Sequence, residues 1–251
     1  MLVLVVDTST PQVTAGIVDV PGGGGAPRTL AMRGHVDARA HNEALVPLIL
    51  ECLGEAGVAR RDLGAVVAGD GPGPFTGLRV GMATAAAFGD ALGIPVHGVC
   101  SLDSLVQTPA ADLSAVSGDP AAAADAPVVL AVTDARRREV YAAAYRADAR
   151  VWGPAVLAPG AVLTELDDAG LPAPSLIVGD ADLGARVAGE SGADVVARRP
   201  DPALLAARAD LGAAPEPLVA RYLRRPDAMP PKPRPRSAAL PDPAGVPGVG
   251  P

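Results

Sequence analysis

The stretch "LVLVVDTS" (residues 2–9) decides the fold of the first half of the chain. It is aliphatic without alternation up to its aspartate, which predicts a strand buried on both faces. A second strand is expected over residues 13–20 and a third over residues 29–36, with the glycines at 22–25 as the turn between them. Because short turns join antiparallel neighbours, the chain is expected to open with a three-stranded meander.

The pattern then changes to alternating helices and strands. Helices are expected over residues 40–57 and 78–93, because each apolar stretch stops at a glycine that can cap a helix. A buried strand before the second helix and another over residues 95–99 follow, and Ser101 is expected to cap a further helix. This order matches the ribonuclease-H-like half of the actin-like (ASKHA) superfold. We therefore predict an α/β fold whose first lobe spans residues 1–105.

The second half of the chain has the pattern of a smaller and partly degenerate ribonuclease-H-like lobe, which we place at residues 106–225. The stretch "VVLAVTDARRREVYAAAYR" predicts a hairpin. Two further strands and three helices are expected at residues 151–157, 175–178, 160–169, 181–189 and 202–211. Low-complexity composition predicts a surface loop at residues 109–127 and a disordered Pro/Gly-rich tail at residues 226–251.

Composition restricts the class of protein. A chain of 251 residues that is 49% hydrophobic can bury a sizeable core. Its net charge of −7 argues against a broad electrostatic contact with nucleic acid or anionic lipid, but leaves room for a local basic patch. Cys52 and Cys100 lie among aliphatic residues, as buried thiols in a reducing cytosol do. Neither a secretory signal nor a membrane-spanning apolar run is found, so a cytoplasmic protein is expected.

The stretch "GDGPGPFTGLRVG" (residues 69–81) resembles a phosphate-binding loop before a helix, a unit that directs backbone N–H groups at an anion. It has neither the lysine of a Walker A motif nor the spacing of a Rossmann motif. Asp7, at the end of the first strand, is suited to hold a hydrated Mg²⁺ or to form a turn with the next amides. The loop is therefore either a nucleotide site, working or vestigial, or a tight turn. Its candidate residues are Asp7, Thr8, Ser9, Gly71, Gly73, Thr76 and Gly77.

Residues for metal ligation and nucleophilic catalysis are sparse in the sequence. The histidines are His35, His41 and His97, and no two of them lie four residues apart on a helix. No G-x-S-x-G elbow is present to support a serine nucleophile. We therefore expect no catalytic residue and no metal ligand in this chain.

The two long predicted helices of the first lobe carry more apolar surface than one sheet covers. Gly81, Ala85 and Gly89 repeat every four residues and would allow close backbone approach. This excess predicts a helical dimer interface, and the alternative is a helix pair buried within the chain. The candidate interface residues are Leu45, Leu48, Ile49, Cys52, Leu78, Gly81, Met82, Ala85, Phe88 and Gly89.

The stretch "TDARRREVY" (residues 133–141) places an aspartate and three arginines at a strand end. Arginines in this setting can contact phosphate or RNA, but charge runs more often mark a solvated hairpin tip.

The segments "LVVDTST", "GPGPFTGLRVG", "GIPVHGVCSLDSL", "TDARRREVYAAAY" and "ARYLRRPDA" together resemble the bacterial TsaB (YeaZ) family over residues 1–228. The resemblance implies a two-lobed actin-like fold and a scaffold subunit without catalysis of its own. Such subunits pair with the metal-dependent transferase TsaD and work with a TsaE-type ATPase to install threonylcarbamoyl groups on tRNA. ATP and the metal ion are then expected in the partner subunits, and tRNA is an indirect partner. Asp134, Arg136, Arg137, Tyr222 and Arg224 are candidate contacts to RNA or a partner.

The transferase subunit carries a metal-binding H-x-x-x-H motif on the helix after the meander. The corresponding positions here are His41 and Leu45, so the pair is broken. A homodimer of the isolated chain stays open, because one apolar face can serve both pairings. The alternative functions are an ASKHA-type ATPase or small-molecule kinase, suggested by Asp7 and the glycine loop, and a glycoprotease-like peptidase, which no ligand cluster supports.

Overall fold

The aliphatic run that opens the chain forms β1 (Leu2–Asp7), the central strand of a five-stranded sheet in the first lobe. The computed structural model describes residues 1–23, 25–36, 41–106, 126–147 and 149–224, without the side chains of His41 and Asn42. The first sheet has the order β3-β2-β1-β4-β5, and its other strands are β2 (Gln12–Asp19), β3 (Arg28–Val36), β4 (Leu63–Gly71) and β5 (Val96–Cys100). β1, β2 and β3 pair antiparallel, whereas β4 and β5 run parallel to β1. The predicted meander is confirmed.

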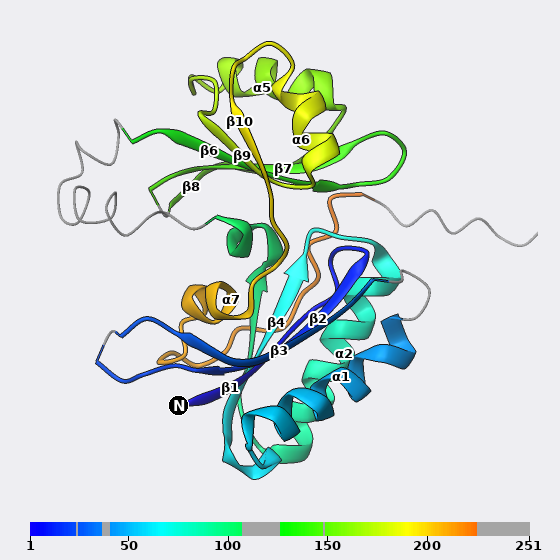
Figure 1. The fold of residues 1–251 in the computed structure, drawn as a ribbon, viewed down its shortest axis with the longest axis vertical. Coiled ribbons are helices and arrows are strands. Elements are labelled where there is room, and N and C mark those ends of the chain that lie inside the picture. Colours follow the sequence, from blue (N-terminus) through cyan, green and yellow to red (C-terminus); the bar gives the residue numbers. More distant parts are fainter. Residues whose placement is uncertain (24, 37–40, 107–125, 148, 225–251) are drawn as a thin grey trace, which may run out of the picture.

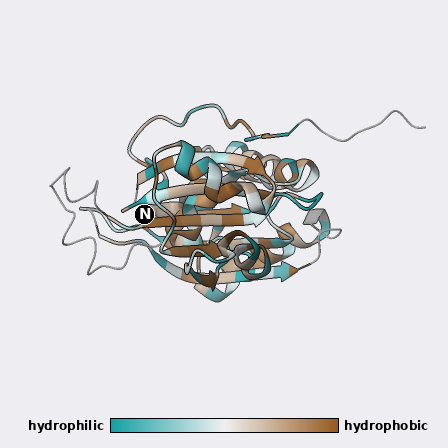
Figure 2. Cartoon of the chain, turned by 90° about the horizontal axis from the view of Figure 1, so that it is seen from above, coloured by the Kyte–Doolittle hydropathy of each residue, from teal (hydrophilic) through white to brown (hydrophobic). Residues whose placement is uncertain are grey.

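Helices cover both faces of this sheet, which explains why β1 shows no alternation of polar and apolar residues. Leu4 and Val6 pack in the core beneath α1 (His41–Ala56) and α2 (Phe75–Leu92). Val3 and Val5 point the other way, toward Leu205 of α7 (Pro202–Arg208). Figure 1 shows α1 and α2 on one side of the sheet and α7 on the other. Figure 2 shows the strands as the most hydrophobic parts of the chain.

The glycine stops of both long helices are confirmed, and two other details differ from the prediction. Gly57 and Gly93 have φ values of +65° and +66°, in the left-handed region that ends helices. Helix α2 begins at Phe75, before the predicted start, because Pro74 is extended and fits the position before a first turn. Ser101 does not cap an α-helix: it begins the short 3-10 helix η2 (Ser101–Leu105), without a side-chain cap.

The second sheet has the same strand topology as the first when its strands are taken from the opposite edge. Its order is β10-β9-β6-β7-β8, with β6 paired antiparallel to β7 and parallel to β9. The strands are β6 (Val128–Asp134), β7 (Val140–Arg146), β8 (Ala149–Leu157), β9 (Leu176–Gly179) and β10 (Asp194–Ala197). Its helices α5 (Val162–Asp168) and α6 (Ala181–Ala188) are short. The two-lobed α/β fold is confirmed, and the smaller size of the second lobe comes from its helices. The sequence missed β10, a short strand of mostly exposed residues at the sheet edge.

The chain returns to the first lobe after β10, so the predicted boundary of the second lobe at residues 106–225 needs correction. Helix α7 packs on the first sheet, where Gly16 leaves room for the Pro202 ring. Residues 209–224, here called the strap, then run from the first lobe to the second (Figure 1). Leu218 packs on the first-lobe core and Leu223 on a cluster that includes β6 and β7 residues. The strap therefore connects the two lobes.

Several predictions lie outside the described residues. These are the start of the first helix at Ala40, most of the loop at residues 109–127, and the tail at residues 226–251. Within the described ranges, no helix has both the length and the apolar character needed to cross a membrane.

Candidate functional site

The residues that follow β1 form a buried turn. Asp7 is 1% exposed, and its Oδ1 accepts hydrogen bonds from the Ser9 amide at 2.9 Å and the Ser9 hydroxyl at 2.6 Å. An aspartate that bonds the amide two residues ahead forms an Asx turn. This geometry matches the turn that the sequence offered as an alternative to a Mg²⁺ ligand.

The glycine loop packs directly on this turn. Thr8 Oγ1 donates to the Gly77 carbonyl at 2.7 Å. A Cβ on Gly73 would lie 2.6 Å from the Ser9 carbonyl oxygen, and a Cβ on Gly81 would lie 2.3 Å from Thr8 Oγ1. These approaches are too close for any side chain at either glycine. The structure thus brings the turn and the loop together, and their mutual packing is a sufficient reason for these glycines.

Two further positions complete this junction and were missed by the sequence. Gly69 lies where a Cβ would come within 1.8 Å of Asp7 Oδ2, and Ser101 Oγ accepts from the Gly71 amide at 3.3 Å. Gly71 itself has φ +103°, which side chains rarely adopt. Thr76 differs from the other loop candidates because it is exposed. The sign of the packing on Asp7 that the sequence offered was the glycine at position 69, just before the loop.

A cavity of about 570 Å³ opens between the lobes beside the turn. Thr10 and Gln12 line it from the first lobe, and Asp134, Asp180 and Arg198 line it from the second. The Asp180 carboxylate accepts from the Leu183 amide at 3.0 Å and thereby caps α6. Of the described residues that line this cavity, none is Asp7 or a loop glycine.

Metal ligands do not gather in the described part of the chain. No group of three or more His, Cys, Asp or Glu side chains there could hold a metal ion. His35 is exposed on β3 and His97 is buried on β5. The His41 side chain lies outside the description, and Leu45, the other position of the broken pair, is fully buried in the core.

The structure corrects the choice of interface residues. Seven of the ten candidates are buried inside the chain, namely Leu45, Ile49, Cys52, Leu78, Gly81, Ala85 and Gly89. Only Leu48, Met82 and Phe88 are partly exposed. The stripe of small residues on α2 packs on its own lobe, because a Cβ on Gly89 would lie 2.2 Å from Val96 of β5. The spacing correctly indicated close approach, but the partner of the stripe is the chain's own sheet.

A different apolar surface is exposed between the two helices. It is a groove of about 610 Å³, here called the α1–α2 groove, lined by Val46, Phe75, Thr76, Arg79, Val80, Ala83, Thr84, Ala87 and Phe88. On α1, Val46 and Leu50 are each 42% exposed. The side of α2 that faces solvent here is rich in alanine, a residue that gives a weak signal in sequence because it suits exposed and buried positions alike.

Aromatic and cationic side chains stack at one end of this groove. The Arg79 guanidinium lies 4.2 Å above the Phe75 ring. The Phe75 ring in turn contacts Tyr222 of the strap, with 5.1 Å between ring centroids. The strap thus closes the end of the groove at the first turn of α2.

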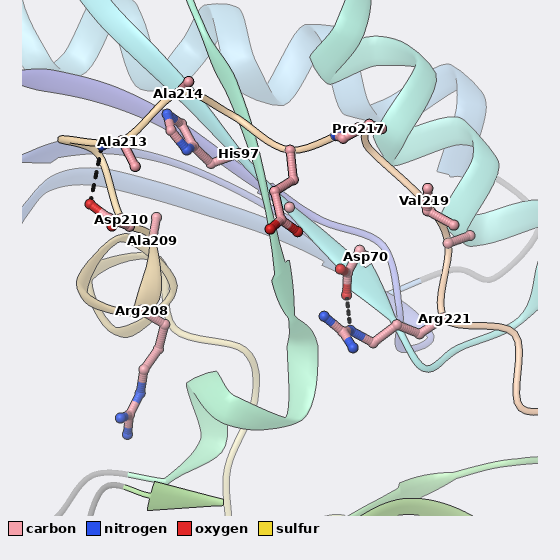
Figure 3. A pocket seen from close by; sticks show the side chains of 13 residues that line it. Asp70, His97, Arg208, Ala209, Asp210, Ala213, Ala214, Pro217, Val219 and Arg221 are labelled. Carbon is pink, nitrogen blue, oxygen red and sulfur yellow. Dashed lines mark hydrogen bonds and ion pairs between the residues drawn. The ribbon is translucent and has the colours of Figure 1, made fainter.

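The strap also covers a second cavity of about 560 Å³, shown in Figure 3. Asp70, at the end of β4, is buried there and accepts from Arg221 Nε at 2.7 Å. The Arg221 amide donates to the Asp70 carbonyl at 2.8 Å, so the backbone and the ion pair fix the strap together. Burial raises the pKa of the Asp70 carboxyl above its ordinary value of 3.8, and the Arg221 charge lowers it in part.

Replacing Arg221 with glutamine should raise the pKa of Asp70 further, because the favourable charge is lost while burial remains. Since this pKa is higher in the folded than in the unfolded state, the stability that Asp70 contributes is greatest at low pH and falls as the pH rises through the folded-state pKa. The ¹³Cγ chemical shift of Asp70, followed against pH, measures the change. Arg61→Gln, at a side chain that is 89% exposed, is the control. A lower or equal Asp70 pKa in the Arg221 variant would contradict this account.

The predicted RNA contacts lie in two parts of the molecule. Residues 134–139, here called the arginine turn, join β6 to β7, and Arg136, Arg137 and Arg138 are all exposed there. Asp134 instead holds the turn, by accepting from the Arg136 amide at 2.7 Å. Arg224 of the strap also stabilises the turn. It donates a hydrogen bond to the Ala135 carbonyl at 3.2 Å and forms an ion pair with Glu139. Tyr222 packs on Phe75, as described above, and Arg138 was not among the sequence candidates.

Comparison with known proteins connects this geometry to a family. Residues 33–176, more than half of the chain, match the family model described as TsaD, tRNA N6-adenosine threonylcarbamoyltransferase. TsaB of Escherichia coli is 32% identical over 110 residues, which cover 44% of this chain and 43% of that protein. The chain therefore belongs to this family.

Longer matches to other proteins extend the comparison. An uncharacterized protein of Mycobacterium tuberculosis is 46% identical over 231 residues, which cover 91% of this chain and 94% of that protein. An uncharacterized protein of Mycobacterium leprae is 49% identical over 231 residues, but these span only 56% of its own length. The solved structure of YeaZ from Pseudomonas aeruginosa has the same fold, with a TM-score of 0.60, 24% identity, and coverage of 88% of this chain and 99% of that chain.

Proposed function

We propose that this chain is a TsaB-type, non-catalytic subunit of a tRNA-modifying complex and pairs with a TsaD-type transferase. In that complex the transferase and a TsaE-type ATPase would supply the metal ion and the ATP. The chain would act in the cytoplasm, where tRNA is modified. Pairing with a second copy of itself remains the competing use of the same surface.

The observation that carries the proposal is the α1–α2 groove. It exposes apolar side chains on two adjacent helices, and such exposed grooves are typical of protein interfaces. A transferase of the same family would present a similar helix pair, so the two grooves could pack in a pseudo-twofold arrangement. Arg79 and Tyr222 would lie at one end of this contact, and arginine and tyrosine are both enriched in protein interfaces.

The packing of the glycine loop supports a structural role for it. Hydrogen bonds and close contacts with Thr8 and Ser9 account for the glycines, and the loop fixes the first turn of α2 beside the groove. We infer that the loop holds the interface helix in place and that phosphate binding is not its task in this chain.

Co-expression with the transferase from the same organism tests the proposal. A tagged transferase should retain this chain at a fixed 1:1 ratio, and sedimentation velocity should show one complex in place of two separate species. Two separate species at micromolar concentration would overturn the proposal. A self-dimer that persists in the presence of the transferase would favour the homodimer instead.

The cavity between the lobes favours a second candidate, a nucleotide-dependent enzyme. Its volume of about 570 Å³ is within the range of small-molecule sites, and Thr10, Gln12 and Asp180 offer polar groups. This reading expects the isolated chain to bind ATP in calorimetry and to turn it over, with both properties weakened by Gln12→Ala in the cavity wall. The scaffold proposal expects neither property in the isolated chain.

A further inference from the structure

We propose that the arginine turn binds the sugar–phosphate backbone of RNA through Arg136, Arg137 and Arg138. The inference rests on the proposed function in taking tRNA as the RNA, and it assigns this chain a direct contact with it. The first argument is charge: residues 134–139 together with Arg224 hold four arginines against two carboxylates, an excess of two positive charges. The whole chain carries −7, so this cationic surface is local.

The second argument is conformation. Arg136, Arg137 and Arg138 have φ values of +62°, +54° and +62°. Three successive non-glycine residues in the left-handed region are unfavourable, and such backbone persists only where the surroundings impose it. Here the surroundings are identified: the Ala135 amide donates to the Glu139 carbonyl at 3.1 Å, and the Glu139 amide donates to the Arg136 carbonyl at 3.0 Å.

Two side chains hold the same turn, Asp134 from within the hairpin and Arg224 from outside it. Asp134 accepts from the Arg136 amide, and its carboxylate also lies 3.3 Å from the Arg136 guanidinium. Arg224 comes from a strap that begins about seventy residues later in the chain, and it contacts both Ala135 and Glu139. A solvated tip would not need this support. The structure instead presents three guanidinium groups on a fixed backbone.

The chemistry of the turn favours RNA over a protein partner. Guanidinium groups pair with phosphate oxygens through two parallel hydrogen bonds, and arginine is the residue most suited to that contact. Protein interfaces instead need an apolar centre. Among the described residues, no large exposed apolar side chain belongs to the turn, and Ala135 and Val140 beside the arginines are buried. The turn therefore offers charge without an apolar surface, as contacts to a phosphate backbone require.

The strap places this RNA contact and the proposed protein contact on connected elements. Tyr222 packs on Phe75 at the end of the α1–α2 groove, and Arg224, two residues later, braces the arginine turn. A transferase bound at the groove would thus hold the turn at a set position relative to itself.

The test uses the complex of the full chain with its transferase and an unmodified tRNA transcript. The variant is Arg136→Asn, Arg137→Asn and Arg138→Asn, because asparagine accepts left-handed backbone. The control is Arg28→Gln, Arg60→Gln and Arg61→Gln, which removes the same charge from exposed positions of the first lobe, on β3 and just before β4. Fluorescence anisotropy over a series of salt concentrations gives the affinity and its salt dependence.

The Asn variant should bind tRNA at least about tenfold more weakly than the control. The slope of log affinity against log salt concentration should be smaller in magnitude by about 2, since each lost phosphate contact removes roughly 0.7–0.9. Equal affinity of the two variants would overturn the inference. The inference would also be overturned if the Asn variant kept its affinity for tRNA but lost its binding to the transferase. That result would mean that the turn contacts an acidic protein surface. If the wild-type chain fails to pair at all, the proposed function falls, and the isolated chain still tests the turn by the same comparison.

Discussion

Replacing Ala83 and Ala87 with glutamate is expected to abolish pairing with the transferase. Both residues line the α1–α2 groove, both are exposed, and they lie four residues apart on α2. Two carboxylates placed in an apolar contact would lose their hydration without gaining partners. We expect the affinity to fall by at least about a hundredfold, since burial of an unpaired charge costs several kcal/mol. Because glutamate is a good helix former, the stability of the isolated chain should change by less than about 0.5 kcal/mol.

A matched control separates the groove from general surface charge. Ala181 and Ala185 are also exposed and four residues apart, on α6 of the second lobe. The double variant Ala181→Glu, Ala185→Glu should therefore pair like the wild type. Sedimentation velocity with the transferase measures both variants. Pairing that is equally weak, or equally strong, in the two variants would exclude the groove as the contact.

Replacing Gly81 with alanine is expected to destabilise the first lobe. The new Cβ would lie 2.3 Å from Thr8 Oγ1 and would disturb the buried hydrogen bond from Thr8 to the Gly77 carbonyl. Overpacking costs about 1–3 kcal/mol, and a disrupted buried hydrogen bond costs about 1–3 kcal/mol more. The higher helix propensity of alanine returns up to about 1 kcal/mol. We expect a net loss of roughly 2–4 kcal/mol, measurable by urea denaturation.

Gly54 provides the control for this substitution. It lies inside α1, and a Cβ there would meet no atom within 4 Å. Gly54→Ala should therefore stabilise the protein, by roughly 0.5–1 kcal/mol. If Gly81→Ala were also neutral or stabilising, the close packing of α2 on the turn after β1 would be wrong.

The sequence predicted most of the fold because its local signals agreed. The unbroken aliphatic run of β1 indicated a strand covered on both faces, and Gly57 and Gly93 marked the helix ends. The sequence could not show on which of the two sheets α7 packs, because an amphipathic helix of seven residues carries no sign of the sheet that it will cover. That assignment depends on the Gly16–Pro202 contact, which joins residues far apart in the chain.

In the candidate site, the spacing of residues likewise predicted which face of a helix is closely packed but not what that face packs against. The repeat of Gly81, Ala85 and Gly89 correctly predicted a face of close approach, yet periodicity does not say whether that face meets another chain or its own sheet. The exposed face of α2 is formed largely by alanines, which are common in both settings. Likewise the arginines of the turn are visible in the sequence, whereas the brace from Arg224 appears only in the fold.

Reconstituted tRNA modification tests the central claim most directly. The transferase, the ATPase and the threonylcarbamoyl donor are combined with unmodified tRNA, with and without this chain, and the modified adenosine is quantified by mass spectrometry. The scaffold account predicts product only when this chain is present, none from this chain alone, and none when the groove carries the Ala83→Glu, Ala87→Glu substitutions. Equal product without the chain would contradict the account.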